Sequence, residues 1–412
     1  MPPQKSKNST TLAIVFATVV IDMLGVGILI PVVPLLLTDP AYQYHLPLAL
    51  STGYVVLGFL TAIFPFMQFI ATPILGQLSD HVGRKKVLAF SLAGTSISYA
   101  IFALGIIFRN IPLLFVSRAL DGITGGNIAV AQAAIADSSA PENRAKNFGL
   151  IGAALGIGFV IGPFLGGELS NPHLVSWFNA TTPFWFASVL SALNTLSVIF
   201  FFRETLAKKT REKIRIAQSF INIQTAFLSK KFRAYFGTSF LYMSGFTFFT
   251  TFFGVFLINK FGYDQGGIGL YFAYIGIFIA LTQGLLVRYV AKRSSHATTI
   301  SIALFVFSLT LLCLSLTSAS WLLYVFAIPQ CICIGLIMAN MTALISVNAG
   351  DHEQGKVLGI SASVQALGQS IPPVISGYLA ANLSAVAPLV TASIMVFIAA
   401  LSFVFFVRPK LK

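Results

Sequence analysis

The chain has 412 residues, of which 56% are hydrophobic and only 9% are charged, and its mean hydropathy is +0.86. Soluble domains carry about 25% charged residues, so this composition excludes an ordinary soluble protein and indicates a membrane protein with many spans. The net charge of +14 does not indicate a nucleic-acid-binding protein, because the basic residues lie in the gaps between apolar runs and form no single cluster.

Twelve apolar runs are each long enough to cross a bilayer as a helix, which needs about 20 residues. They lie at 11–37, 51–77, 87–108, 112–137, 146–169, 183–203, 233–259, 267–290, 297–317, 320–348, 356–380 and 385–407. The first run is too long for a signal peptide and contains an acid, so we interpret it as a span. The sequence therefore predicts an all-α membrane protein with twelve transmembrane helices.

The basic residues orient these helices. An even number of spans places both termini on the same side, and all but three of the 26 Lys and Arg residues lie on that side. Arg109 and Lys260 lie on the other side, and Arg118 lies inside a span. Because cytoplasmic loops are enriched in Lys and Arg, we predict that both termini are cytoplasmic.

A basic segment at 204–232 divides the chain into an N-terminal six-span half, 1–203, and a C-terminal six-span half, 233–412. Apolar residues recur every three or four positions in its second part, which favours a helix lying on the inner membrane surface. A flexible tether is the alternative. The two halves resemble each other weakly at matching places, a pattern typical of transporters that rock two halves about a central site.

Three charged residues lie in the interior of the predicted spans, away from the span ends. Asp22 lies near the middle of the first span, and Arg118 and Asp121 share one face of the fourth span at i and i+3. Charges inside a membrane are expensive and indicate an ion pathway or proton relay by default. Two arrangements are open: a permanent Asp22–Arg118 pair that only joins two helices, or an Arg118–Asp121 pair that leaves Asp22 to exchange protons.

Two further patterns are candidates for moving parts. Gly76, Asp80, Gly83 and Arg84 lie in the loop between the second and third spans, and Asp137 lies at the cytoplasmic end of the fourth. An Arg84–Asp137 ion pair there would form a latch on the inner gate; a turn with surface charges is the alternative. The fifth span contains a proline among small residues, which permits close helix packing and bending: Gly158, Gly162, Pro163, Gly166 and Gly167.

These motifs resemble a known family. Residues 76–86 are similar to motif A of the major facilitator superfamily, 118–125 to its motif B, and 158–167 to its motif C, which marks the antiporters. The stretch 118–149 resembles the bacterial tetracycline/proton antiporters within the twelve-span drug/proton antiporter family. The resemblance implies the major facilitator fold, alternating access and a proton gradient as the energy source, with no cofactor.

The resemblance also assigns residues. It implies an embedded charge pair at Asp22 and Arg118, an inner-gate latch at Asp80, Arg84 and Asp137, and a bendable fifth helix. Two features depart from the family pattern. The tetracycline exporters carry a histidine and an aspartate in spans of the second half, which this sequence lacks, and Asp121 stands where motif B more often has a neutral residue. These two departures weigh against tetracycline as the substrate and against recognition of a metal chelate.

The spans of the second half offer neutral polar groups among many phenylalanines. The best candidates for a substrate cavity are Gln283, Gln330, Asn340, Gln365 and Gln369. An aromatic cavity with amide groups suits amphipathic organic molecules, including cations. The alternative is that the phenylalanines face lipid and the amides join helices.

The sequence thus predicts a monomeric, proton-coupled exporter of amphipathic organic compounds or drugs in the bacterial inner membrane. One alternative is export of an endogenous metabolite, such as a siderophore or a sugar; another is proton-coupled uptake. We expect no enzyme activity and no metal site. No span and its adjoining loop offer a nucleophile together with a general base, and no residues have the spacing of metal ligands.

Overall fold

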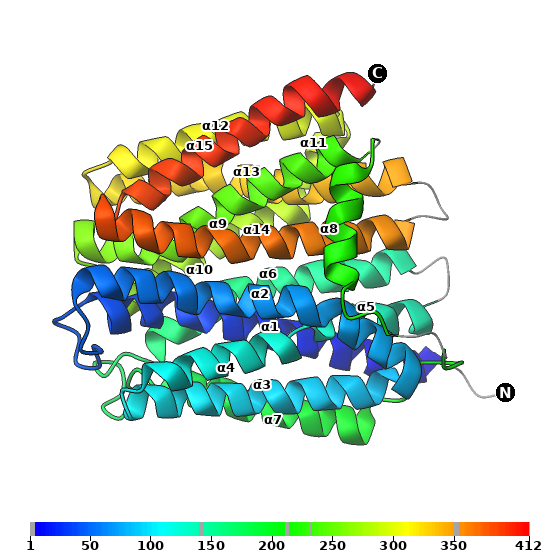
Figure 1. Cartoon of the computed structure of the whole chain (residues 1–412), viewed down its shortest axis with the longest axis horizontal. Coiled ribbons are helices and arrows are strands. Elements are labelled where there is room, and N and C mark those ends of the chain that lie inside the picture. Colours follow the sequence, from blue (N-terminus) through cyan, green and yellow to red (C-terminus); the bar gives the residue numbers. More distant parts are fainter. Residues whose placement is uncertain (1–4, 140–143, 211–213, 231, 350–353, 412) are drawn as a thin grey trace. The chain divides into compact units, whose positions relative to one another are not determined.

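The computed structural model describes residues 5–139, 144–210, 214–230, 232–349 and 354–411 (Figure 1). Every regular element in these ranges is a helix. Four predicted cytoplasmic basic residues lie outside them: Arg211, Lys213, Lys231 and Lys412. The contacts between residues divide the chain into two compact units, Met1–Val32 with Ile63–Gln218, and Val33–Ala62 with Ser219–Lys412. This border falls inside the first two helices, so the division at 203 and 233 stays a prediction.

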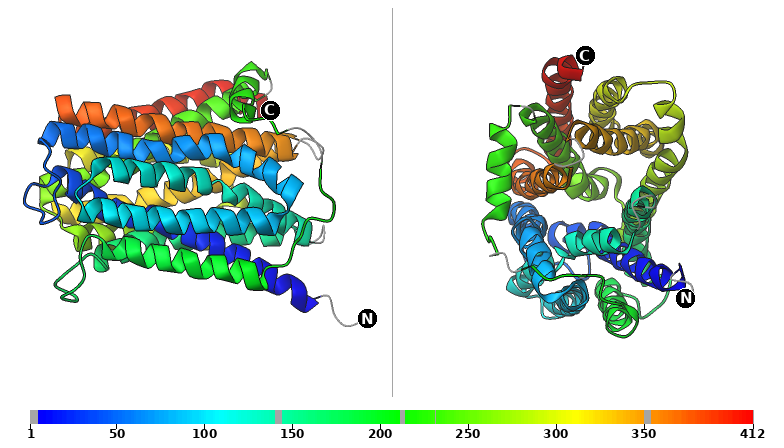
Figure 2. Two further views of the ribbon diagram at one scale, coloured as in Figure 1. Left: turned by 60° about the horizontal axis from the view of Figure 1, so that its bottom comes forward. Right: turned by 90° about the vertical axis from the view of Figure 1, so that its right-hand side faces the viewer.

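The helices of the predicted N-terminal half lie in the first unit, except for residues 33–38 and 50–62, which belong to the second. They are α1 (Lys5–Thr38), α2 (Leu50–Val82), α3 (Arg84–Ile107), α4 (Ile111–Thr124), α5 (Asn127–Ser138), α6 (Arg144–Glu168) and α7 (Thr182–Phe201). Helix α3 packs against α4, α5 and α7; Figure 2 gives two further views of the helices. Small and branched side chains from α1, α3 and α5 form much of the core of this unit, among them Val19, Leu92, Val130 and Ala134, all fully buried.

The second unit has an aromatic core. Its helices are α8 (Gln218–Leu228), α9 (Arg233–Phe261), α10 (Gln265–Leu281), α11 (Val287–Ala291), α12 (His296–Leu316), α13 (Ser320–Ala349), α14 (Gln354–Asn382) and α15 (Ala387–Ser402). Phe253 of α9 packs against Tyr271 of α10, with the two rings tilted and their centroids 5.1 Å apart. The helix expected in the central segment is present as α8, and it lies crosswise to α9 and α14 in Figure 1.

Ten helices of the described residues are long and apolar enough to cross a membrane. The fourth predicted span differs, because residues 112–137 form two helices that are separated at Gly125 and Gly126. Glycine is a poor helix former, and the side chain of Gln68 donates a hydrogen bond of 2.8 Å to the Gly125 carbonyl. The eighth span also changes, with a π-helical turn at Thr282–Leu286 between α10 and α11. Helix α14, the eleventh predicted span, is one long helix, but it is less apolar than the ten helices counted above as able to cross a membrane.

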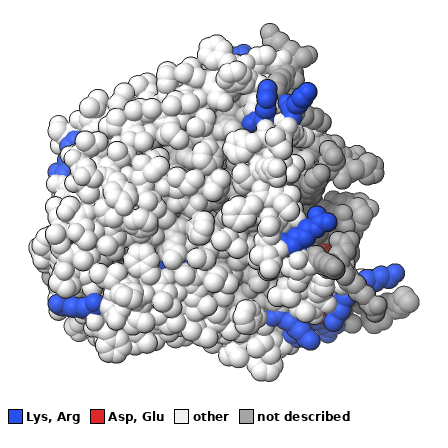
Figure 3. All heavy atoms as spheres, viewed as in Figure 1, with Lys and Arg blue, Asp and Glu red and all other residues white. Residues whose placement is uncertain are grey.

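The charge distribution agrees with a membrane protein. On the face drawn in Figure 3, uncharged residues cover the sides of the helices, and Lys and Arg gather toward the helix ends. Many large apolar side chains on these surfaces are exposed, for example Phe90 on α3 and Phe200 on α7. Such a surface is suited to lipid contact.

Candidate functional site: a buried charge cluster and a latch

The charged residues of the predicted spans lie together in the first unit. Arg118 and Asp121 on α4 form an ion pair of 2.6 Å, and their side chains are 4% and 3% exposed. The guanidinium of Arg118 also lies over the ring of Phe64, 4.5 Å from its centroid. Of the two arrangements that the sequence left open, the structure has Arg118 paired with Asp121. The Asp22–Arg118 pair implied by the family resemblance does not form among the described residues.

Asp22 forms no ion pair with any cation in the described part of the chain. Both of its carboxylate oxygens are buried, and neither has a hydrogen-bond partner within the described ranges. Asn127, the first residue of α5, lies close enough to interact with this carboxylate, but its own amide atoms make no hydrogen bond of normal length. Nothing in the sequence singles out Asn127, because its position depends on the break between α4 and α5.

A small cavity joins the two carboxylates. It has about 10 Å³ of space for the centre of a water molecule, and its walls include Asp22, Asp121, Thr95 and Tyr99. This volume is near the minimum that holds one water. Gly25 shapes the site, because a Cβ atom at that position would lie well inside the hydroxyl group of Tyr99. Glycine at position 25 thus leaves room for the Tyr99 side chain beside the cavity that Asp22 lines.

The glycines of α6 bring this helix against the backbone of α1. A Cβ atom at Gly158 would lie 2.7 Å from the Val20 carbonyl oxygen, and one at Gly162 would lie 2.7 Å from the Leu24 carbonyl oxygen. Gly166 is in a similar position beside Ile28, and Gly27 of α1 faces Pro163. The predicted close packing is therefore present, and it involves the helix that carries Asp22. Gly167 is buried, and its carbonyl accepts a hydrogen bond from the Ser170 hydroxyl.

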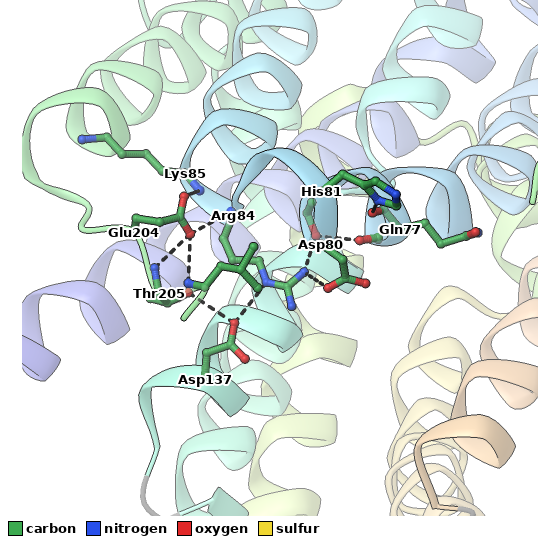
Figure 4. Close-up of polar contacts among 11 residues, drawn as sticks. Gln77, Asp80, His81, Arg84, Lys85, Asp137, Glu204 and Thr205 are labelled. Atoms are coloured by element: carbon green, nitrogen blue, oxygen red, sulfur yellow. Dashed lines mark hydrogen bonds and ion pairs between the residues drawn. The ribbon is translucent and has the colours of Figure 1, made fainter. Parts of the chain in front are cut away.

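The predicted latch residues also meet (Figure 4). The Arg84 side chain contacts Asp80 at 2.5 Å and Asp137 at 3.1 Å, and it donates a hydrogen bond to the Ser79 hydroxyl. Arg84 is buried, whereas the two carboxylates keep 43% and 27% of their side-chain exposure. Gly76 makes only an ordinary contact with Ala129, so the structure gives no special reason for a glycine there.

The polar candidates of the second unit do not form one cluster. Gln330 is completely buried, and within the described ranges its amide has no partner. Asn340 bonds to His296 and to the Leu336 carbonyl, so it joins helices. Gln365 donates to Ser361; Gln283 and Gln369 are half-buried. A cavity of about 500 Å³ between α12 and α15 is lined by none of the five, so their role in substrate binding stays a prediction.

A sequence model of the Major Facilitator Superfamily matches residues 15–371 and 235–412. The class D tetracycline resistance protein of Salmonella ordonez is 30% identical over 377 residues, covering 87% of this chain and 86% of that protein. The class H tetracycline resistance protein of Pasteurella multocida is 29% identical, covering 90% and 88%. Multidrug resistance protein 2 of Bacillus subtilis (strain 168) is 27% identical, covering 91% and 90%.

Solved structures show the same fold. The human organic anion transporter MFSD10 (TETRAN) superposes with a TM-score of 0.72 at 22% identity, covering 98% of this chain and all of that one. A bacterial homologue of the human lysosomal transporter Spinster, in an inward-facing and occupied conformation, superposes with a TM-score of 0.76 at 13% identity, covering 98% of each chain. Sequence and fold agree, and the chain belongs to the major facilitator superfamily.

Proposed function

We propose that this protein is a proton-coupled antiporter that exports amphipathic organic compounds, drugs among them, by alternating access. Protons that move inward drive the substrate outward, so the proton gradient supplies the energy and no cofactor is needed. We place the protein in the bacterial inner membrane with both termini in the cytoplasm, and we expect a monomer to be the working unit. The tetracycline and multidrug resistance proteins among its relatives support drug export.

The environment of Asp22 is the observation that most strongly supports the proposal. Its carboxylate is buried without a partner among the described residues, while Asp121 already neutralises Arg118. An ionised carboxylate without a partner is expensive to keep away from water. Asp22 must therefore hold a proton in this conformation or meet water in another one. A group that binds a proton with different free energies in two conformations couples proton movement to the conformational change.

Export of toxic compounds is tested with a deletion strain. We expect the strain to become sensitive to several amphipathic compounds on a toxin panel, while the metabolites in its medium stay unchanged. Loss of one metabolite from the medium, with unchanged toxin resistance, would instead support a dedicated metabolite exporter. Counterflow in vesicles of known orientation separates export from uptake.

The latch gives a prediction about the inner gate. We expect Arg84→Ala to increase opening on the cytoplasmic side, because it removes two ion pairs and the bond to Ser79. Both carboxylates are partly exposed and regain water, so the loss is about 1–2 kcal/mol. The measurement is the labelling rate of single cysteines introduced at the cytoplasmic ends of α5 and α13. Lys86→Ala, which changes an exposed neighbour, is the control; equal labelling in the two variants would contradict the latch.

A further inference from the structure

The acid that follows α7, Glu204, caps the first turn of α3 (Figure 4). Its carboxylate accepts hydrogen bonds from the backbone N–H of Arg84 at 2.9 Å and of Lys85 at 3.2 Å. The N–H groups of Thr205 and Leu206 donate to the same carboxylate, each at 3.0 Å. Helix α3 has no side-chain cap from its own Ncap residue. A carboxylate at a helix N-terminus satisfies free N–H groups and interacts well with the helix dipole.

The backbone conformation of Gly83 and its lack of a side chain make room for the Glu204 carboxylate. Its φ of +114° lies in a region that other residues rarely adopt. A Cβ atom at this position would also collide with the Glu204 carboxylate. The glycine that the sequence placed in the latch therefore has a specific task, which is to let the carboxylate reach the start of α3.

The residues that follow Glu204 also contact residues of the latch. The Thr205 hydroxyl lies 3.5 Å from the Asp137 carboxylate, and the Thr210 N–H donates to the Asp80 carbonyl at 3.0 Å. Further on, the Arg215 N–H donates to the Gln77 side chain at 2.8 Å, and the Gln77 amide donates back to the Arg215 carbonyl at 3.4 Å. We call residues 204–210 and 214–215 the strap. It bonds to the residues on both sides of Arg84 and to Arg84 itself.

We propose that the strap is a working part of the inner-gate latch, with Glu204 as the residue that positions Arg84 between Asp80 and Asp137. This inference rests on the proposed function, which makes these ion pairs the inner-gate latch. The latch opens only when Glu204 leaves the start of α3. The strap runs directly into α8, whose residues from Ser219 onward belong to the second unit. Movement of that unit therefore reaches the latch through the covalent chain.

The test is the ratio of closed to open protein, measured from the distance between spin labels. Labels at K86C on α3 and K292C after α11 report the cytoplasmic side, and both positions are exposed. In a cysteine-free background we expect Glu204→Ala to raise the ratio of open to closed protein about fivefold, which corresponds to about 1 kcal/mol for a lost cap. Glu204→Gln keeps one acceptor oxygen and should give a smaller shift. It also covers the case in which the alanine variant fails to fold.

Two further variants sharpen the result. Glu168→Ala removes an acid at the far end of α6 and should leave the ratio unchanged. Gln77→Ala releases the strap at its other end and should shift the ratio in the same direction as Glu204→Ala, with less than the summed effect when the two are combined. A cap that only stabilises the fold would lower the melting temperature and leave the distances unchanged. That outcome overturns the inference.

Failure of the strap and failure of the proposed function give different results. The distance measurement needs neither substrate nor a proton gradient. If Arg84→Ala shifts the distances and Glu204→Ala does not, the latch exists and the strap is not part of it. If both shift the distances but Asp22→Asn still couples transport to protons, the strap stands and the assignment of Asp22 fails.

Discussion

Asp22→Asn is expected to abolish proton-coupled transport and to leave membrane insertion intact. Asparagine has the size of the protonated acid and fits the same buried site, but it cannot release a proton. The variant should therefore fold while the conformational cycle loses its link to the gradient. Transport is measured in proteoliposomes as substrate-driven movement of protons, with a pH-sensitive dye inside and a compound identified on the toxin panel outside. We expect the signal to fall to the level of empty liposomes.

The control for this variant lies directly after the same helix. Asp39 follows the last residue of α1, and its carboxylate accepts a hydrogen bond from the Ala41 N–H at an exposed position. Asp39→Asn keeps that bond and should transport normally. Normal proton movement by Asp22→Asn would refute the proposed role of this residue.

Gly162→Ala is expected to have the second large effect, on both stability and transport. The added methyl group would meet the Leu24 carbonyl oxygen at 2.7 Å and the Gly27 Cα atom at 2.9 Å. Backbone atoms cannot turn aside as a flexible side chain can, so α6 must move away from α1. Overpacking of this kind costs about 1–3 kcal/mol. Because Leu24 is two residues from Asp22, the shift also moves the carboxylate relative to its cavity.

The same helix supplies the matched control. A Cβ atom at Gly156 or Gly152 would meet nothing within 4 Å among the described residues. Alanine at these positions should be neutral or slightly stabilising, since it is the better helix former. The measurement is the melting temperature of each purified variant in detergent, together with its transport rate. Equal melting temperatures for Gly162→Ala and Gly156→Ala would show that the α1–α6 contact does not matter.

Much of the architecture could be predicted from local sequence. The lengths of the apolar runs were enough to predict the spans. The i, i+3 spacing placed Arg118 and Asp121 on one face of a helix, and the structure pairs them there. The Arg84–Asp137 contact was also predicted correctly. In these cases the signal lies in a few neighbouring residues, or in charges that have few possible partners in an apolar environment.

The features that could not be predicted from the sequence depend on contacts between residues that are far apart in the chain. The fourth span is continuously apolar, and its break at Gly125 and Gly126 also involves a hydrogen bond from Gln68 on another helix. The sequence does not single out Glu204, because nothing near it shows that the chain returns to the start of α3. The predicted ninth span, 297–317, begins one residue after His296, which is the first residue of α12 and bonds to Asn340.

The central claim is that the protonation of Asp22 selects the side of the membrane to which the protein opens. The direct test is the distance between spin labels at K86C and K292C, measured as pH is varied with no substrate present. We predict that the wild-type distances shift between two populations with pH, and that Asp22→Asn keeps the population of the protonated protein at every pH. An unchanged pH-dependent shift in Asp22→Asn would contradict the claim, since some other group would then be the switch.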